Sequence, residues 1–188
     1  VCRRQRQMCI RDRSFPCSFD FRYYKDIYIV KTNLNGAALW QKTHGNEYLE
    51  KGTDIVAKEG GGYIIAGEKC DHGYNISSCD NRAKIILLEI DEDGNSNQET
   101  VLNNLYFFEA GSPISISNTS NGGYVFVSKP KNNGYTWFYK WGQNENSIDL
   151  KLENAGYGGE SIEMSNDGGF IIGTSGSTII KTDQELNF

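Results

Sequence analysis

The chain has few of the side chains on which most catalytic sites depend. It contains two histidines, His44 and His72, and neither is accompanied by a Gly-x-Ser-x-Gly nucleophile motif. A hydrolytic triad needs a serine or cysteine within reach of a histidine, with a carboxylate behind that histidine. We therefore interpret His44 as a polar residue at a strand end, and we predict no catalytic residue and no cofactor.

Long apolar runs and a basic surface are also missing. No stretch approaches the roughly 18 apolar residues that a membrane-spanning helix requires. The net charge is −5, and five of the seven arginines lie within the first 13 residues, so the remainder of the chain is more acidic than the total suggests. An acidic body without a basic face argues against nucleic acid or an anionic membrane as a partner.

Residues 1–13 differ in composition from everything that follows. Besides the five arginines they hold two of the five cysteines. The segment resembles a translated sequencing-adapter fragment fused to a reading frame, and we treat it as a non-native leader. A basic targeting arm or a nucleic-acid-binding tail is the alternative. In either case the fold is expected to begin at residue 14.

A repeated glycine pair is the most informative pattern that is present. Each pair precedes an aromatic residue and a run of β-branched or small apolar residues, which indicates a tight turn entering a buried strand. The copies are Gly61-Gly62-Tyr63-Ile64-Ile65-Ala66-Gly67, Gly122-Gly123-Tyr124-Val125-Phe126-Val127-Ser128 and Gly168-Gly169-Phe170-Ile171-Ile172-Gly173-Thr174. The repeating unit is therefore built from hairpins.

A second motif recurs downstream of each glycine pair and once before the first pair. It is a short apolar strand centred near Lys31, Glu89, Lys140 and Lys181. A spacing of about 40 to 60 residues, with short strands and no helical apolar periodicity, favours propeller blades over helical or leucine-rich repeats. The expected strands are Asp26–Thr32, Ala38–Lys42, Thr53–Lys58, Tyr63–Lys69, Lys84–Ile90, Asn97–Leu102, Pro113–Asn118, Tyr124–Lys129, Thr136–Trp141, Ser147–Leu152, Glu160–Ser165, Phe170–Thr174 and Thr178–Thr182.

The predicted fold class is therefore all-β. We expect residues 14–188 to form a single, partial β-propeller domain of four-stranded antiparallel blades, with two full blades and two partial ones. The glycine pairs should join the innermost strand of a blade to its second strand. Asp26–Thr32 and Thr178–Thr182 should lie at or near open edges, where neighbouring blades of a longer chain would be the natural partners.

The segment from Lys31 to Gly45, with Trp40 near its centre, carries a family resemblance together with Thr53-Asp54-Ile55-Val56 and the first glycine-pair motif. It resembles the tandem β-propeller repeats of secreted and cell-surface bacterial proteins. More distantly it is similar to the tryptophan-docked blades of quinoprotein-type propellers. The resemblance implies a propeller fold and an extracellular or cell-surface location. Trp40 has no tryptophan equivalent in the later outer strands, and no quinone site is carried over.

One short motif suggests a sialidase-type propeller. Ser165-x-Asp167-x-Gly169 matches the first half of an Asp box, but Ile172 stands where the box requires an aromatic residue. Sialidases also need several arginines that bind the substrate carboxylate, and only Arg22 and Arg82 lie outside the leader. We interpret Asp167 as a turn residue.

Two cysteines flank a turn-rich insertion. A disulfide between Cys70 and Cys79 would stabilise this insertion by roughly 2 to 3 kcal/mol in an oxidising compartment. Free thiols, or zinc bound by the two cysteines and His72, are the alternatives. Exposed, bridged cysteines would place the protein outside a reducing cytosol, and Cys17 would then be the one free thiol after the leader.

An acidic segment from Asp91 to Glu99 has the oxygen density of a calcium loop. Its glycine, Gly94, stands fourth, whereas an EF-hand requires glycine at the sixth position. The corresponding place in the first copy, Asn33-Leu34-Asn35-Gly36, is a plain hairpin turn. A hairpin turn is the main interpretation for both segments, and no metal site is predicted.

Aromatic residues in the connections between blades are the candidate ligand contacts. These connections open on the same face as the Cys70–Cys79 insertion, and aromatic rings there could stack on a sugar or hold a peptide. The alternative is that they wedge between blades. The candidates are Tyr48, Tyr106, Phe107 and Tyr157.

The sequence thus predicts a non-catalytic binding or scaffolding module with a protein or glycan ligand. The alternative is part of a propeller enzyme of the glycan-hydrolase type, with its catalytic residues in blades that this chain lacks.

Overall fold

The computed structural model describes residues 26–46, 48–70, 79, 83–102, 114–128, 136–142, 145–153 and 158–187. These residues form thirteen strands and no helix. Every strand pairs in an antiparallel manner with the strand that follows or precedes it in the chain. The predicted all-β class is confirmed.

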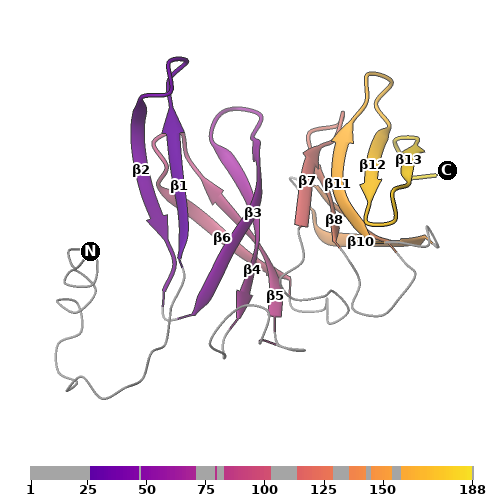
Figure 1. Ribbon diagram of the computed structural model, residues 1–188, viewed down its shortest axis with the longest axis horizontal. Helices are drawn as coiled ribbons and strands as arrows, with labels where there is room; N and C mark the ends of the chain where they lie inside the picture. Colours follow the sequence, from indigo (N-terminus) through magenta and orange to yellow (C-terminus); the bar gives the residue numbers. More distant parts are fainter. Residues whose placement is uncertain are drawn as a thin grey trace.

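The strands are grouped in four sheets, which we number in chain order (Figure 1). The first sheet contains β1 (Ile27–Thr32) and β2 (Ala38–His44). The second sheet contains β3 (Leu49–Ala57), β4 (Tyr63–Cys70), β5 (Ala83–Ile90) and β6 (Ser96–Leu102). The third sheet contains β7 (Ile114–Asn118), β8 (Tyr124–Ser128), β9 (Thr136–Gly142) and β10 (Glu145–Glu153). The fourth sheet contains β11 (Gly159–Met164), β12 (Phe170–Thr174) and β13 (Ile179–Thr182).

Within each sheet the strands lie side by side in chain order, so each sheet is a simple meander. In the described sheets β1 and β13 are edge strands with one paired neighbour each. The thirteen predicted strands overlap the thirteen observed ones, with the largest difference at β3, which begins at Leu49 rather than Thr53. None of the described residues forms a helix with the length and apolar character needed to cross a membrane.

The two glycines of each repeated pair have different roles. The first has a positive φ in all three copies, 104° at Gly61, 81° at Gly122 and 83° at Gly168, which is the turn requirement that the sequence indicates. The second lies against the backbone of the third strand. A Cβ on Gly169, for example, would stand 2.0 Å from the Thr182 carbonyl oxygen. Both glycines are therefore needed, one for the turn and one for close approach of two strands.

Three hydrophobic clusters lie between consecutive sheets. Ile27 and Ile29 of β1 pack with Ile65, Ile86 and Leu88 of the second sheet. The second and third sheets enclose the largest cluster, and the third and fourth sheets enclose the last. The middle sheets are thus buried on both faces, and the four sheets follow one another from one end of the molecule to the other (Figure 1).

The largest cluster is held by stacked aromatic rings. The rings of Phe126 and Tyr139 are nearly parallel, with centroids 4.6 Å apart, and both side chains are buried. Tyr124 and Trp141 form a second, tilted pair on the same face of the third sheet, with centroids 5.5 Å apart. Aromatic pairs at these separations stabilise a core beyond the area that they bury.

The first strands of the last three sheets are joined by side-chain hydrogen bonds. Asp54 of β3 accepts from the Ser115 hydroxyl at 2.8 Å and from the Ile116 amide of β7 at 3.0 Å. The same pattern repeats between β7 and β11, where Ser115 accepts from the Ile162 amide at 3.2 Å and Ser117 from the Met164 amide at 3.1 Å. We refer to these contacts as the inner-strand ladder.

Trp40 makes the contact between the first and second sheets at the turn end. Its indole N–H donates to the Glu92 carbonyl at 2.8 Å, and Lys42 donates to the Asn95 side chain at 3.2 Å. Gly94 is required beneath the indole, because a Cβ there would stand 2.8 Å from the ring. Trp40 therefore docks on the turn of the following sheet.

Candidate functional site

Tyr48 is the one predicted ligand contact that lies within the described residues. It precedes β3, whose first residue, Leu49, pairs with Cys70 at the end of β4. Tyr48 therefore lies at the same end of the second sheet as the cysteine insertion, as the sequence predicts. Its half-buried ring faces Lys69, with the Lys69 Nζ 5.0 Å from the ring centroid. Tyr106, Phe107 and Tyr157 lie outside the described residues.

Lys69 is the centre of a compact group of ionisable side chains. Its Nζ donates to Glu99 Oε1 at 2.7 Å and lies 3.6 Å from Glu50 Oε1. Only 7% of Lys69 is exposed. Burial alone would lower the pKa of this ammonium, but the hydrogen bond and charge of Glu99 and the charge of Glu50 outweigh burial and raise the pKa above its usual value. Lys69 is therefore a buried side chain that stays positively charged, at the end of the second sheet.

Glu50 is the most perturbed acid of this group. Its side chain is 2% exposed, and burial raises its pKa to about 7, although the Lys69 charge and a hydrogen bond from the Asn46 backbone act in the opposite direction. The negative charges of Asp26 and Glu99 raise the pKa further. Glu50 thus takes up and releases a proton near neutral pH.

We call Tyr48, Glu50, Lys69 and Glu99 the Lys69 cluster. Glu50, Lys69 and Glu99 are not predicted as site residues from the sequence, because single charged residues within strands normally face solvent. The available signal was register: Glu50 and Lys69 are directly opposed on β3 and β4, where opposite charges pair across strands. The cluster can hold a charge and a proton, but Glu50 and Lys69 are too buried to touch a ligand directly.

The structure joins Cys70 and Cys79 in a disulfide with a Cα–Cα distance of 5.9 Å. Both residues are buried, at 1% and 2% exposure, and belong to the largest hydrophobic cluster. The expectation of exposed cysteines is therefore wrong. Cys70 and Cys79 lie inward because a disulfide is apolar and the end of β4 faces the third sheet. His72, the third possible zinc ligand, lies outside the described residues.

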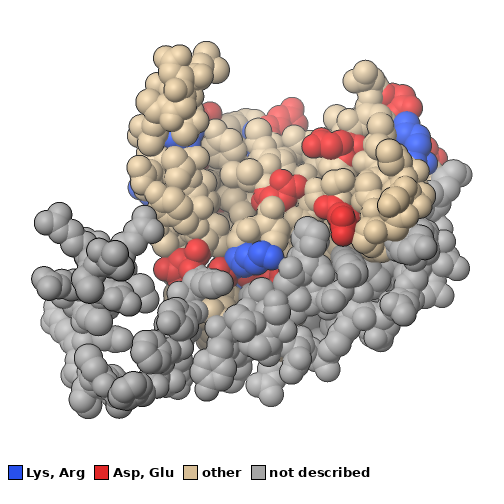
Figure 2. All heavy atoms as spheres, in the orientation of Figure 1, with Lys and Arg blue, Asp and Glu red and all other residues tan. Residues whose placement is uncertain are grey.

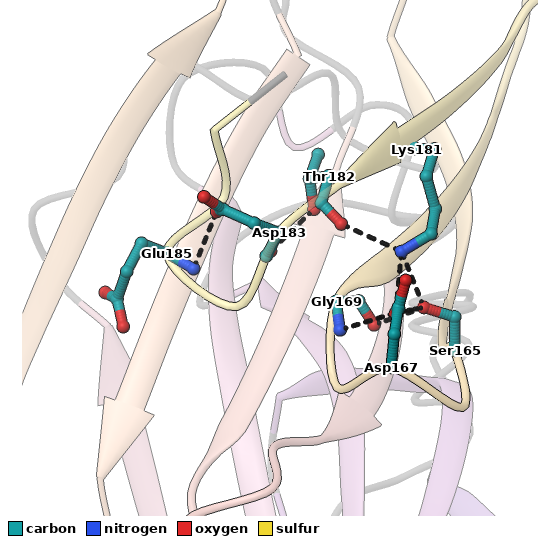
Figure 3. A network of polar contacts seen from close by, with 7 residues as sticks. All are labelled: Ser165, Asp167, Gly169, Lys181, Thr182, Asp183 and Glu185. Atoms are coloured by element: carbon teal, nitrogen blue, oxygen red, sulfur yellow. Dashed lines mark hydrogen bonds and ion pairs between the residues drawn. The ribbon is translucent and has the colours of Figure 1, made fainter.

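The turn around Asp167 explains the partial Asp box (Figure 3). Asp167 Oδ1 accepts from the Gly169 amide at 3.1 Å and from Lys181 Nζ at 2.8 Å. Lys181 also donates to the Ser165 hydroxyl at 2.8 Å and to the Thr182 carbonyl at 3.0 Å. Hydrogen bonds from Lys181 and Ser165 hold the pKa of Asp167 well below its usual range. Asp167 is a turn residue, and its carboxylate is occupied within the hairpin.

The acidic segment at Asp91 is also a hairpin turn. Asp91 Oδ1 accepts from the amides of Asp93 at 2.9 Å and Asn95 at 2.8 Å, and its other oxygen accepts from the Asn95 side chain at 3.0 Å. These bonds lower the pKa of Asp91.

Within the part of the chain that the structure describes, no three His, Cys, Asp or Glu side chains are grouped so that they could hold a metal ion. His44 is half-buried at the end of β2.

A shallow groove of about 250 Å³ lies at the turn end, between the third and fourth sheets. Its lining includes Tyr124, Trp141 and Phe170 together with Lys140 and Glu185, which form an ion pair at 2.9 Å. The sequence analysis did not identify this groove. The signal was the position of Tyr124 and Phe170 directly after two successive glycine pairs, which places them at the same end of neighbouring sheets. Tyr124 and Phe170 are 2% and 1% exposed, so their rings offer little apolar surface to a ligand.

Comparisons with known proteins identify no family. No family model matches the chain, and no curated protein matches it. Among solved structures, the crystal structure of a protein of unknown function from Bacteroides caccae is similar over 88% of this chain and 88% of that chain, with 13% sequence identity and a TM-score of 0.21. A likeness at this TM-score carries no argument about fold or function.

Proposed function

We propose that the four sheets are consecutive blades of a β-propeller. Each complete sheet is a four-stranded meander, and β3, β7 and β11 each begin a sheet. The inner-strand ladder places these three strands next to one another, as the innermost strands of neighbouring blades would lie.

We further propose that the chain is a non-catalytic binding or scaffolding module. The observation that carries this proposal is the burial of Glu50, the described carboxyl group whose pKa would best suit proton transfer near neutral pH. A general acid of a glycan hydrolase must touch the glycosidic oxygen, which a side chain at 2% exposure does not do. Glu50 is therefore not a candidate general acid for the hydrolase alternative, which places its catalytic residues in blades that this chain lacks.

The proposed ligand face is the end of the sheets that carries Tyr48 and the disulfide. Tyr48 has the amphipathic ring that commonly contacts sugars and peptides, and Lys69 behind it fixes the ring orientation at little entropic cost. A protein or a glycan is the expected class of ligand. The Cys70–Cys79 disulfide supports a secreted or cell-surface location, because such bonds persist in oxidising compartments.

Glycan and peptide arrays test this function. The wild-type protein should retain at least one ligand class without cleaving it, and Tyr48→Ala should weaken that binding by roughly 2- to 12-fold, since a stacked aromatic contact contributes about 0.5 to 1.5 kcal/mol. Leu34→Ala is the control, because Leu34 is fully exposed on the β1–β2 turn at the opposite end. Cleavage of a retained glycan, detected by mass spectrometry, would contradict a non-catalytic role. Equal binding by the Tyr48 and Leu34 variants would remove the proposed face.

A further inference from the structure

Each middle sheet has two apolar faces, one turned toward the preceding sheet and one toward the following sheet. Ile64 and Leu87 of the second sheet face the third sheet and are each 1% exposed. Val125 of the third sheet occupies the same position as Ile64 in the repeat, faces the fourth sheet and is 0% exposed. The forward face of a sheet is therefore buried wherever another sheet follows it.

The fourth sheet has the same forward face without a cover. Ile171 is the repeat equivalent of Ile64 and Val125, and it is 44% exposed. Ile179 is the equivalent of Leu87, and it is 77% exposed. Lys181 lies on the same face, but its ammonium is drawn to the turn by Ser165 and Asp167 (Figure 3). The apolar side chains of this face are therefore Ile171 and Ile179, and Glu163 of β11 lies opposite Ile171.

The first sheet has an uncovered backward face. Val30 is the equivalent of Leu88 and Ile180, which are 4% and 9% exposed against their preceding sheets, whereas Val30 is 43% exposed. Tyr28 and Leu39 share this face, at 59% and 60% exposure. The Tyr28 hydroxyl donates to the Gln41 side chain beside it, so these two neutral polar groups are partners of each other.

The described surface is otherwise marked by separate charged side chains, mostly acidic (Figure 2). Two sheet faces with exposed apolar side chains belong to the first and fourth sheets, which lie at opposite ends of the series (Figure 1). One is a forward face and the other is a backward face of the same repeated interface. They correspond to the forward face of the second sheet and the backward face of the third sheet, which pack against each other within the chain.

We propose that the chain associates with a second copy of itself, head to tail, by packing the backward face of β1 and β2 onto the forward face of β12 and β13. The interface continues the series of sheet contacts across the boundary between copies, with Val30 and Ile179 in the positions that Tyr139 and Leu87 occupy inside the chain. The two surfaces differ, so one contact leaves a free face on each copy, and association proceeds to rings or chains rather than stopping at a symmetric dimer. This inference does not depend on the proposed ligand.

Sedimentation velocity over a dilution series of the full chain tests the proposal. The wild-type protein should show a mass that rises with concentration beyond that of a dimer. Val30→Glu and Ile179→Glu each block one face, and each variant alone should be monomeric, with the dissociation constant raised by at least about 100-fold because a charge is buried without a partner. Both positions are exposed in the single copy, so the variants should retain the wild-type unfolding midpoint at concentrations where the wild type is also monomeric.

The decisive measurement is sedimentation velocity of an equimolar mixture of the two variants. Val30→Glu keeps its forward face and Ile179→Glu keeps its backward face, so the mixture should form a heterodimer and nothing larger. Ile55→Glu is the matched control, since Ile55 is 46% exposed but lies on neither face, and it should associate as the wild type does. A monomeric wild-type protein at every concentration, a mixture that stays monomeric, or loss of association in the control would each overturn the proposal. Oligomers held by disulfides on a non-reducing denaturing gel would also overturn it.

Discussion

At the residue scale, Leu186 places a buried side chain at a repeat position where other copies have a turn glycine. It occupies the place of Gly36 and Gly94 in the hairpin turn after the third strand of each unit. All three residues have positive φ, 79° and 77° at the glycines and 61° at Leu186. The Leu186 side chain is buried in the cluster between the third and fourth sheets. Packing therefore offsets a conformation that costs a side chain about 1 to 2 kcal/mol.

The opposing effects of packing and backbone strain at Leu186 predict different results for two substitutions. Leu186→Ala keeps the strained φ and loses the packing, and should reduce the free energy of unfolding by about 2 to 4 kcal/mol. Leu186→Gly loses the same packing but relieves the strain, so it should be about 1 kcal/mol more stable than Leu186→Ala, the reverse of the usual order of these residues in regular structure. Urea unfolding of the two variants measures the difference. An alanine variant as stable as the glycine variant would show that φ carries no cost here.

Glu50 makes stability depend on pH. Its pKa rises from 4.5 to about 7 on folding, so the folded protein binds more protons than the unfolded chain between these values. The free energy of unfolding should therefore fall as the pH rises from about 4.5 to 7, by up to about 3 kcal/mol from this group. Glu50→Gln should remove this component and flatten the profile over that range. Parallel profiles for wild type and variant would mean that Glu50 titrates normally.

At the element scale, the inner-strand ladder predicts unequal effects at equivalent strand positions. Ser117 of β7 accepts from the Met164 amide of the following sheet, whereas Glu163, its repeat equivalent on β11, faces the side where no further sheet follows in the described structure. Ser117→Ala should cost about 1 kcal/mol or more, because it leaves a partly buried amide without its acceptor. Glu163→Ala should change stability by less than about 0.5 kcal/mol. Equal costs at both positions, measured by chemical denaturation, would contradict the ladder.

The strands could be predicted from the sequence because their ends are marked locally. The glycine pair at Gly61 and Gly62 fixes the turn between β3 and β4, and the apolar run that follows it fixes the strand. The Trp40 contact was also expected, as docking between blades, although its partner turn was not. Hairpins of this kind depend on residues close together in the chain.

The side-chain contacts could not be predicted, because they depend on distant residues. The carboxylate of Asp54 meets the Ile116 amide 62 residues later, and nothing in the local sequence of either strand indicates it. The pKa of Glu50 follows from burial among the strands that surround it, and the inward position of Cys70 follows from packing against the third sheet. Tyr48 was predicted as a ligand contact, but its position over Lys69 required the strand register.

At the scale of the whole molecule, the sheets pack in series, and the second, third and fourth sheets are joined through their first strands, β3, β7 and β11. β7 and β11 are edge strands of their own sheets, so the amides that point away from β8 and β12 have no partner within the sheet. In the series, Ile116, Ile162 and Met164 donate these amides to Asp54, Ser115 and Ser117 of the preceding sheet. An amide at the edge of one sheet therefore has an acceptor in the preceding sheet and is not left unpaired.

Native-state hydrogen exchange at these three amides is the measurement that tests the serial packing of the sheets. If the sheets pack in series, Ile116, Ile162 and Met164 exchange as slowly as amides of the central strands, and Ser115→Ala accelerates exchange at Ile162 while Ile116 stays protected. The reason is that Asp54, and not Ser115, accepts from Ile116. Exchange at the rate of solvent-exposed edge amides at all three positions, with the central strands still protected, would contradict the serial packing of the sheets.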